Sequence, residues 1–140
     1  MVTRADKNTP LSNQDQVYSD FLSNLNPHPV AKDIVKFINE RAISRSIRNL
    51  LATNRGERLY QPDIGSDISN LLFEPMSDGL ATSISNLIYD TLNQYEPRAK
   101  VLSISVVPNY DRNLYDVTIT FMIINSQEPF TLNVALDRVR

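Results

Sequence analysis

The spacing of apolar residues changes at Pro97, and this change limits the folds that the chain can adopt. Before Pro97 the apolar side chains recur every three or four positions, which is typical of one helix face: Leu80, Ile84, Leu87, Ile88 and Leu92. Ser77 or Asp78 can cap this helix, and Pro97 prevents its continuation. Beyond Pro97 they recur at every second position, which is typical of a half-buried strand. The chain is therefore predicted to combine helices with a sheet.

The predicted strands lie in three runs, at 102–106, 115–123 and 130–136. Apolar and polar residues alternate in each run, and in the first run the apolar row is Leu102, Ile104 and Val106. Short links rich in turn residues, at 108–113 and 125–129, predict two consecutive hairpins and hence an antiparallel meander. One face of such a meander must be buried, and amphipathic helices can cover it.

The residues before the helix predicted at 80–92 show a less uniform spacing of apolar residues. An amphipathic helix is predicted from one apolar face: Ile43, Ile47, Leu50 and Leu51. The segment 33–39 fits either a helix or a short strand, and its spacing does not decide between them. Residues 1–28 are predicted to form a polar arm, in which Val17, Phe21 and Leu25 recur at helical spacing. One helical turn is predicted at 68–73, within a stretch that is otherwise rich in turn residues.

The composition excludes several classes of protein and site. The 140 residues suit one domain and carry 14 basic against 16 acidic side chains, so neither nucleic acid nor a membrane surface is expected as a partner. The longest apolar run, 121–124, is far shorter than the ~20 residues that span a bilayer. Without cysteine the chain has no disulfide, thiolate nucleophile or cysteine-bound zinc. His28 is the single histidine, so no metal is expected, and no cofactor is expected either.

Acidic side chains offer one route to catalysis. A glycoside hydrolase needs two carboxylates across a cleft, and five residues could supply such a pair: Glu57, Asp63, Glu74, Asp78 and Glu96. Nothing in their spacing requires a pair, and acidic residues in loops are more often solvated or paired with arginine. The sequence also lacks the motifs of nucleotide-binding loops, serine hydrolases, zinc proteases and calcium loops. We therefore predict no catalytic residue and no enzyme activity.

A cluster of arginines lies in and after the first predicted helix: Arg41, Arg45, Arg48, Arg55 and Arg58. A nucleic-acid-binding protein would place such a row against phosphates. The chain is slightly acidic, however, and aromatic residues do not interleave with these arginines. The pattern therefore favours a solvated helix face, or pairing with acidic groups of this or another protein.

The string Tyr95-Glu96-Pro97-Arg98 lies at the junction between the long helix and the first strand of the meander. Pro97 ends the helix and fixes a corner, which Glu96 and Arg98 flank with opposite charges. In a structural interpretation these charges satisfy nearby backbone groups. In a functional interpretation the corner presents them in a set geometry for docking. The residues by themselves favour the structural interpretation.

Four strings occur in one order along the chain, at 46–51, 56–58 with Pro62, 72–75 and 95–98. In this order and spacing they resemble the baseplate wedge proteins of contractile-tailed phages, a sheath-initiator family shared with type VI secretion baseplates. The resemblance extends over residues 33–136. It implies an α+β fold, in which a small antiparallel sheet, made of the three-strand C-terminal meander plus one earlier strand at 33–39, is covered by two amphipathic helices. The expected organisation is an N-terminal arm at 1–28 and a single domain at 29–140.

The resemblance also implies a function and partners. The chain is expected to be a structural protein of the virion, located in the tail baseplate and assembled in the host cytoplasm. Its expected partners are the tail sheath protein and the baseplate wedge proteins, with tail tube or hub proteins as lesser candidates. By the resemblance, Glu96, Pro97 and Arg98 contact the wedge proteins.

An open sheet edge can accept a strand from another chain, because its N–H and C=O groups lack partners. The candidate edge residues are Phe130, Leu132, Val134 and Leu136 in the last strand, and Ile34 and Val35 in the earlier one. Two alternative functions remain open. One is a peptidoglycan-cleaving enzyme, since some relatives in the family have been described as lysozyme-like, and the other is a regulatory adaptor built on the same fold.

Overall fold

The computed structural model describes residues 18–21, 36–124, 126 and 128–138, and the chain forms two compact units, Met1–Ala42 and Ile43–Arg140. The predicted boundary between arm and domain, at residues 28 and 29, lies outside the described residues.

The first unit contains a two-stranded antiparallel sheet of β1 (Ser19–Phe21) and β2 (Lys36–Ile38), in which Ser19 lies opposite Ile38. Asn39 closes one end of the pair: its backbone N–H donates to the Tyr18 carbonyl over 2.8 Å, and its side-chain oxygen accepts from the Tyr18 N–H over 3.2 Å. Asn39 has a φ of 47°, a left-handed conformation that asparagine tolerates better than most residues. The chain can therefore turn sharply from β2 into the helix that follows.

The strand that the resemblance implied at 33–39 is confirmed for residues 36–38, but its position in the sheet was predicted wrongly. It pairs with β1, whereas the expectation placed it beside the C-terminal meander. The helical spacing of Val17, Phe21 and Leu25 also gave no sign of β1. Three-residue strands are stabilised by main-chain bonds to a partner distant in the chain, and local periodicity does not report such bonds.

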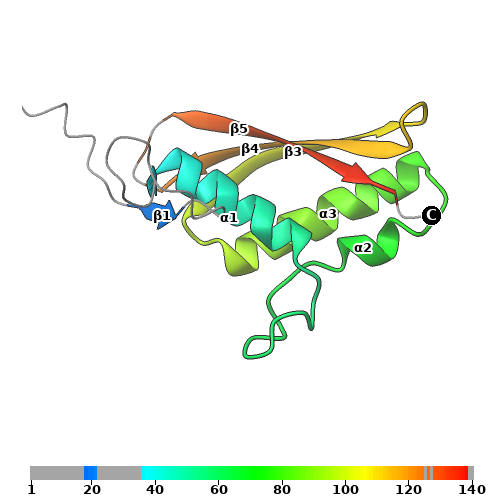
Figure 1. The fold of residues 1–140 in the computed structure, drawn as a ribbon. Helices are drawn as coiled ribbons and strands as arrows, with labels where there is room; N and C mark the ends of the chain where they lie inside the picture. The colour runs from blue at the N-terminus through cyan, green and yellow to red at the C-terminus, as the bar shows by residue number, and fades with distance from the viewer. Residues whose placement is uncertain (1–17, 22–35, 125, 127, 139–140) are drawn as a thin grey trace, which may run out of the picture. The chain divides into compact units, whose positions relative to one another are not determined.

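The second unit contains the remaining elements, with α1 (Glu40–Ala52) starting just before it. The other helices are α2 (Ile68–Leu71) and α3 (Asp78–Tyr95), and the strands are β3 (Ala99–Asn109), β4 (Leu114–Ile123) and β5 (Pro129–Asp137). The strands form an antiparallel sheet in the order β3-β4-β5. Figure 1 shows α1 and α3 on one face of this sheet, with α3 packed along β3. The predicted α+β fold with two helices covering a meander is confirmed.

The core lies between the middle strand β4 and the two longer helices. Every second residue of β4 is buried, as the alternation predicted: Tyr115, Val117, Ile119, Phe121 and Ile123. The helices bury most of the stripes that the sequence predicted: Ile43, Ile47, Leu50 and Leu51 in α1, and Leu80, Ile84, Ile88 and Leu92 in α3. Leu87, the remaining member of the predicted α3 stripe, is only partly buried. Burying one such side chain contributes about 1.5–3 kcal/mol, so this contact dominates the stability of the unit.

The alternation predicted for the first strand fails at Leu102. In the pairing of β3 with β4, Val101 lies opposite Phe121 and Ser103 opposite Thr120, so Leu102 has no partner. This β-bulge turns Leu102 outward, and its side chain is 50% exposed. Ile104 and Val106 remain partly buried, as predicted.

The ends of α3 follow the local sequence. Ser77 is the N-cap, and its hydroxyl accepts a hydrogen bond from the Leu80 N–H over 3.1 Å, which satisfies one of the free donors of the first turn. The helix ends at Tyr95, two residues before Pro97. None of the helices in the described ranges combines the length and the apolar character of a membrane-spanning segment.

Candidate functional site

The corner at 95–98 joins α3 to β3. The Glu96 N–H donates to the Leu92 carbonyl over 2.9 Å as the last turn of the helix, and the Glu96 carbonyl accepts from the Ala99 N–H over 3.1 Å. Pro97 has no N–H to continue the helix, and β3 begins at Ala99. The corner is therefore held by backbone bonds on both sides of the proline.

The Glu96 carboxylate lies inside the protein, where it is 2% exposed, and Arg98 and Ser46 surround it. Arg98 Nε donates to Glu96 Oε1 over 2.5 Å, and Arg98 Nη2 donates to Glu96 Oε2 over 2.8 Å. The Ser46 hydroxyl of α1 donates to Glu96 Oε2 over 2.5 Å and accepts from Arg98 Nη2 over 3.2 Å. This bidentate ion pair between Arg98 and Glu96 fixes the plane of the Arg98 guanidinium.

The three predicted corner residues therefore differ in what they can offer a partner. Both oxygens of Glu96 are occupied within the chain. Pro97 is exposed, and the Arg98 side chain is 38% exposed. No individual role was predicted for Ser46, which lies 50 residues from Glu96. No local pattern could connect residues so far apart.

β5 forms one edge of the three-stranded sheet. The predicted edge residues Phe130, Val134 and Leu136 are partly buried and Leu132 is buried, so these side chains belong to the core layer. The Phe130 ring packs against Phe121, with ring centroids 6.1 Å apart. The part of β5 available to another chain is consequently its main chain, together with the alternate side chains Thr131, Asn133 and Ala135, which are exposed.

Two observations show which backbone groups of β5 face away from β4. The Asn133 carbonyl accepts a hydrogen bond from Arg48 Nη2 of α1 over 3.4 Å. In the other alternating series, the Arg138 N–H just beyond β5 donates to the carbonyl of Asn113, which precedes β4, over 3.2 Å. Because alternate residues of a strand direct their N–H and C=O groups to the same side, those of Thr131 and Ala135 also face outward.

The other predicted edge residues, Ile34 and Val35, lie outside the described residues. The neighbouring β2 pairs with β1 along one side. Of the two predicted edges, the structure therefore describes only the one formed by β5.

The candidate carboxylates do not gather into one site. Glu57, Asp63, Glu74 and Asp78 are exposed, whereas Glu96 is buried in its ion pair. Glu57 Oε2 accepts from the Asn54 N–H over 2.9 Å, which is a structural task. In the part of the chain that the structure describes, no three histidine or acidic side chains are placed to hold a metal ion.

The arginine cluster is likewise divided among separate tasks. Arg55 pairs with Asp67 over 3.3 Å, and Arg48 contacts β5. Arg41 and Arg58 are exposed. This distribution fits the predicted pairing and solvation better than a continuous phosphate-binding row.

Comparisons with known proteins give a consistent result. Residues 39–128 match a family described as baseplate wedge protein gp25. Baseplate wedge protein gp25 of enterobacteria phage T4 is 32% identical over 97 residues, which are 69% of this chain and 74% of that protein.

Two solved structures share the fold. A candidate tail lysozyme from Geobacter sulfurreducens has a TM-score of 0.68 and 27% identity, and the match covers 72% of this chain and 92% of that one. A chain of the anti-feeding prophage baseplate also has a TM-score of 0.68, with 22% identity over 79% of this chain and 89% of that one. At that identity the second likeness concerns the fold alone.

Proposed function

The chain belongs to the family of baseplate wedge protein gp25, and on this premise we propose that it initiates the tail sheath by accepting a strand of a sheath subunit at the edge of β5. It is a structural baseplate protein of a contractile tail, located in the tail baseplate of the virion. In the baseplate, the open edge of β5 would be within reach of sheath subunits.

The observation that carries the proposal is the outward main chain of Thr131, Asn133 and Ala135, in which the Asn133 carbonyl is held by Arg48 Nη2 over 3.4 Å, a contact that an added strand would replace. An edge of this kind can extend its sheet onto an added strand, with main-chain bonds giving adhesion and alternating side chains fixing register. β5 pairs with β4 without a register shift from Pro129 to Asp137, so its edge is regular.

The opposite edge of the sheet is less suited to pairing. β3 contains the bulge at Leu102 and a proline at position 108, and both features interrupt a hydrogen-bonding edge. This difference is why we assign the added strand to β5 rather than to β3.

The proposal is tested with Ala135→Pro, which removes an outward N–H from β5 and leaves the bonds to β4 in place. Purified sheath subunits are mixed with the protein, and sheath assembly is followed by light scattering and electron microscopy. We expect Ala135→Pro to lose nucleation and Ala135→Val, which keeps the N–H, to retain it. A folded Ala135→Pro variant that nucleates sheath as well as the parent chain would refute the use of this edge.

We further propose that the corner at 95–98 ties the chain to the baseplate wedge proteins. Pro97 and the exposed part of Arg98 would form the contact, and Glu96 would act through Arg98 by holding its guanidinium in place. A fixed, partly exposed guanidinium is well suited to bind a carboxylate or carbonyl of a partner. The tail tube and hub proteins remain lesser candidates for the same assembly.

We propose that this role involves no catalysis, although the fold is shared with a candidate tail lysozyme. The support is that the buried carboxylate of the described residues, Glu96, is bound by Arg98 and Ser46. A turbidity assay on purified peptidoglycan should show no lysis by the parent chain. Lysis that is abolished by Glu57→Gln, Glu74→Gln or Glu96→Gln would instead establish an enzyme.

A further inference from the structure

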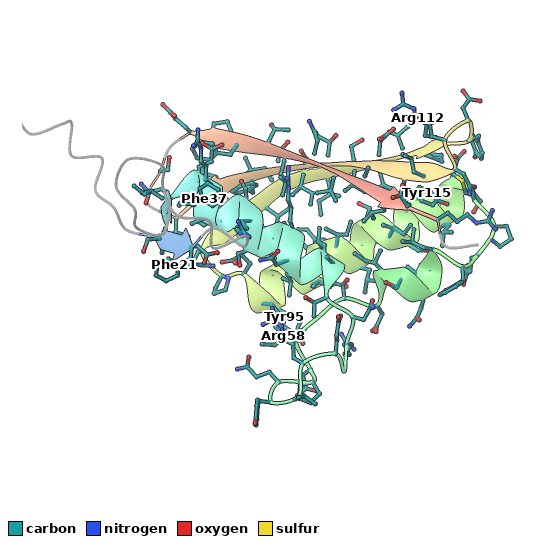
Figure 2. The ribbon with its side chains drawn as sticks, in the orientation of Figure 1. Phe21, Phe37, Arg58, Tyr95, Arg112 and Tyr115 are labelled. Carbon is teal, nitrogen blue, oxygen red and sulfur yellow. The ribbon has the colours of Figure 1, made fainter. Side chains whose placement is uncertain are left out.

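The connection between α1 and α2 carries the two most exposed large apolar side chains of the described residues. Leu59 is 93% exposed and Tyr60 is 97% exposed, and the next is Tyr110 at 62%. Figure 1 shows this connection projecting beyond the helices, and Figure 2 labels Arg58 within it. Single exposed apolar residues are common, but two adjacent ones at the end of a projecting loop need an explanation.

The loop that carries them is braced by its own backbone. The Gly56 N–H donates to the Pro62 carbonyl over 2.7 Å and closes the loop across residues 57–61. At its base the Ser66 N–H donates to the Thr53 carbonyl over 2.9 Å. Gly65 allows this close approach, because a Cβ there would lie 2.8 Å from the Thr53 oxygen.

Side chains fix the same loop to the rest of its unit. The Tyr95 hydroxyl donates to the Asp63 carbonyl over 2.5 Å, and the Ser69 hydroxyl donates to Asn54 Oδ1 over 2.6 Å. Arg55 pairs with Asp67 over 3.3 Å. Leu59 and Tyr60 are thus presented by an ordered scaffold, which lowers the conformational entropy lost when they bind.

The charges at the tip indicate the chemistry of what it binds. Arg58 is exposed, and no carboxylate among the described residues lies within ion-pairing distance of it. Glu57 does not compete, since its carboxylate turns back to the Asn54 N–H. A cation beside an exposed leucine and tyrosine is complementary to an apolar pocket with a carboxylate at its rim.

Tyr95 joins the tip to the corner described above, because it is the last residue of α3 and also holds the loop at Asp63. The loop is therefore attached, through Tyr95, to the end of α3 that leads into the corner we assign to the wedge proteins. We propose that Arg58, Leu59 and Tyr60 form a second contact with a wedge protein, in which Leu59 and Tyr60 enter an apolar pocket and Arg58 meets an acidic group at its rim. The choice of partner rests on the proposed function, whereas the pocket chemistry rests on the tip itself.

The test measures binding of the full chain to purified wedge proteins of the same baseplate, by titration calorimetry. The variant Leu59→Ser/Tyr60→Ser should bind at least about tenfold more weakly, as expected for anchor residues. Tyr110→Ser is the matched control, because it removes an exposed tyrosine from the β3–β4 turn, and it should leave affinity within about twofold. Arg58→Glu should weaken binding more than Arg58→Lys.

The outcomes separate this inference from the proposed function. Unchanged binding by the folded Leu59→Ser/Tyr60→Ser variant overturns the inference alone, whereas no binding of the parent chain to any wedge protein overturns both. Sheath nucleation without wedge proteins should be unchanged in the tip variants and lost in Ala135→Pro.

A cross-linking experiment identifies the occupant directly. Benzoylphenylalanine placed at position 60 in the assembled wedge should link to apolar residues of a wedge protein near an aspartate or glutamate. A link to a second copy of this chain, or to the sheath, contradicts the proposed partner.

Discussion

Glu96 shows how one buried side chain can define a surface. Its carboxylate is enclosed, yet both oxygens are used to orient Arg98, which reaches the exterior. The resemblance to the family pointed to Glu96, Pro97 and Arg98 as one contact. The sequence did not indicate that Glu96 faces inward or that Ser46 completes its hydrogen bonds, because both facts depend on how α1 packs against the end of α3.

Replacing Arg98 tests this arrangement. Arg98→Ala leaves the Glu96 carboxylate buried with the Ser46 hydroxyl as its side-chain donor. We therefore expect a loss of about 1–3 kcal/mol in the free energy of unfolding, less than for a fully buried pair because Arg98 is partly exposed. The double variant Glu96→Gln/Arg98→Ala should lose less than Arg98→Ala. Urea denaturation measures both, with the exposed Arg112→Ala as control. Equal effects of Arg98→Ala and Arg112→Ala would contradict the buried pair.

Two glycines with positive φ should respond differently to alanine. At Gly65 a Cβ would meet the backbone of Arg55 and Asn54 at 2.8 Å, so Gly65→Ala must push the loop apart, and we expect a loss of more than about 2 kcal/mol. At Gly56 a Cβ has open space, and the backbone conformation alone should account for a loss of about 1 kcal/mol. Thermal unfolding compares the two. The reverse order would show that the base of the loop is not tightly packed.

The elements differ in how much of them could be predicted. α3 has a cap, an apolar stripe and a proline beyond its end, all local signals, and the structure places it as predicted. β4 has five alternating apolar residues and lies in the middle of the sheet. Three features were not predicted: the strand β1, the pairing of β2 with β1, and the bulge at Leu102. Each of them is defined by pairing between distant residues rather than by local spacing.

The α3 cap provides a quantitative check at this scale. Ser77→Ala removes the acceptor of the Leu80 N–H, and we expect a loss of about 1 kcal/mol in stability. Ser83→Ala is the matched control: the Ser83 hydroxyl donates to the Gly79 carbonyl inside the helix, where alanine has the higher helix propensity. It should be neutral or slightly stabilising. Similar losses for both variants in urea denaturation would show that Ser77 does not act as a cap.

At the scale of the whole molecule, the described core is built from residues of the second unit and the start of α1. The buried apolar side chains of the described residues extend from Ala42 to Leu132. The sequence predicted this concentration, since the strongest periodic patterns all lie beyond residue 42. It could not predict how the first unit is arranged, because the apolar residues of that unit form no long periodic run.

Removing residues 1–35 tests whether the second unit, with the last seven residues of the first still attached, is stable without the rest of the first unit. We expect a chain that begins at Lys36 to keep its cooperative thermal transition, with a free energy of unfolding within about 1 kcal/mol of the full chain, because the described core is retained. Circular dichroism and amide spectra provide the measurement. A broad, non-cooperative transition would show that the first 35 residues are needed for the core.

The regular edge of β5 also constrains the sequence of any segment that pairs with it. A docked segment would place alternate residues on the helix-covered side, in line with Phe130, Leu132 and Val134, and the others beside Thr131, Asn133 and Ala135. The sequence of the docked segment should then alternate apolar and polar residues, without proline at the positions whose N–H groups bond to β5. Candidate assembly partners can accordingly be screened from their primary structure before any complex is imaged.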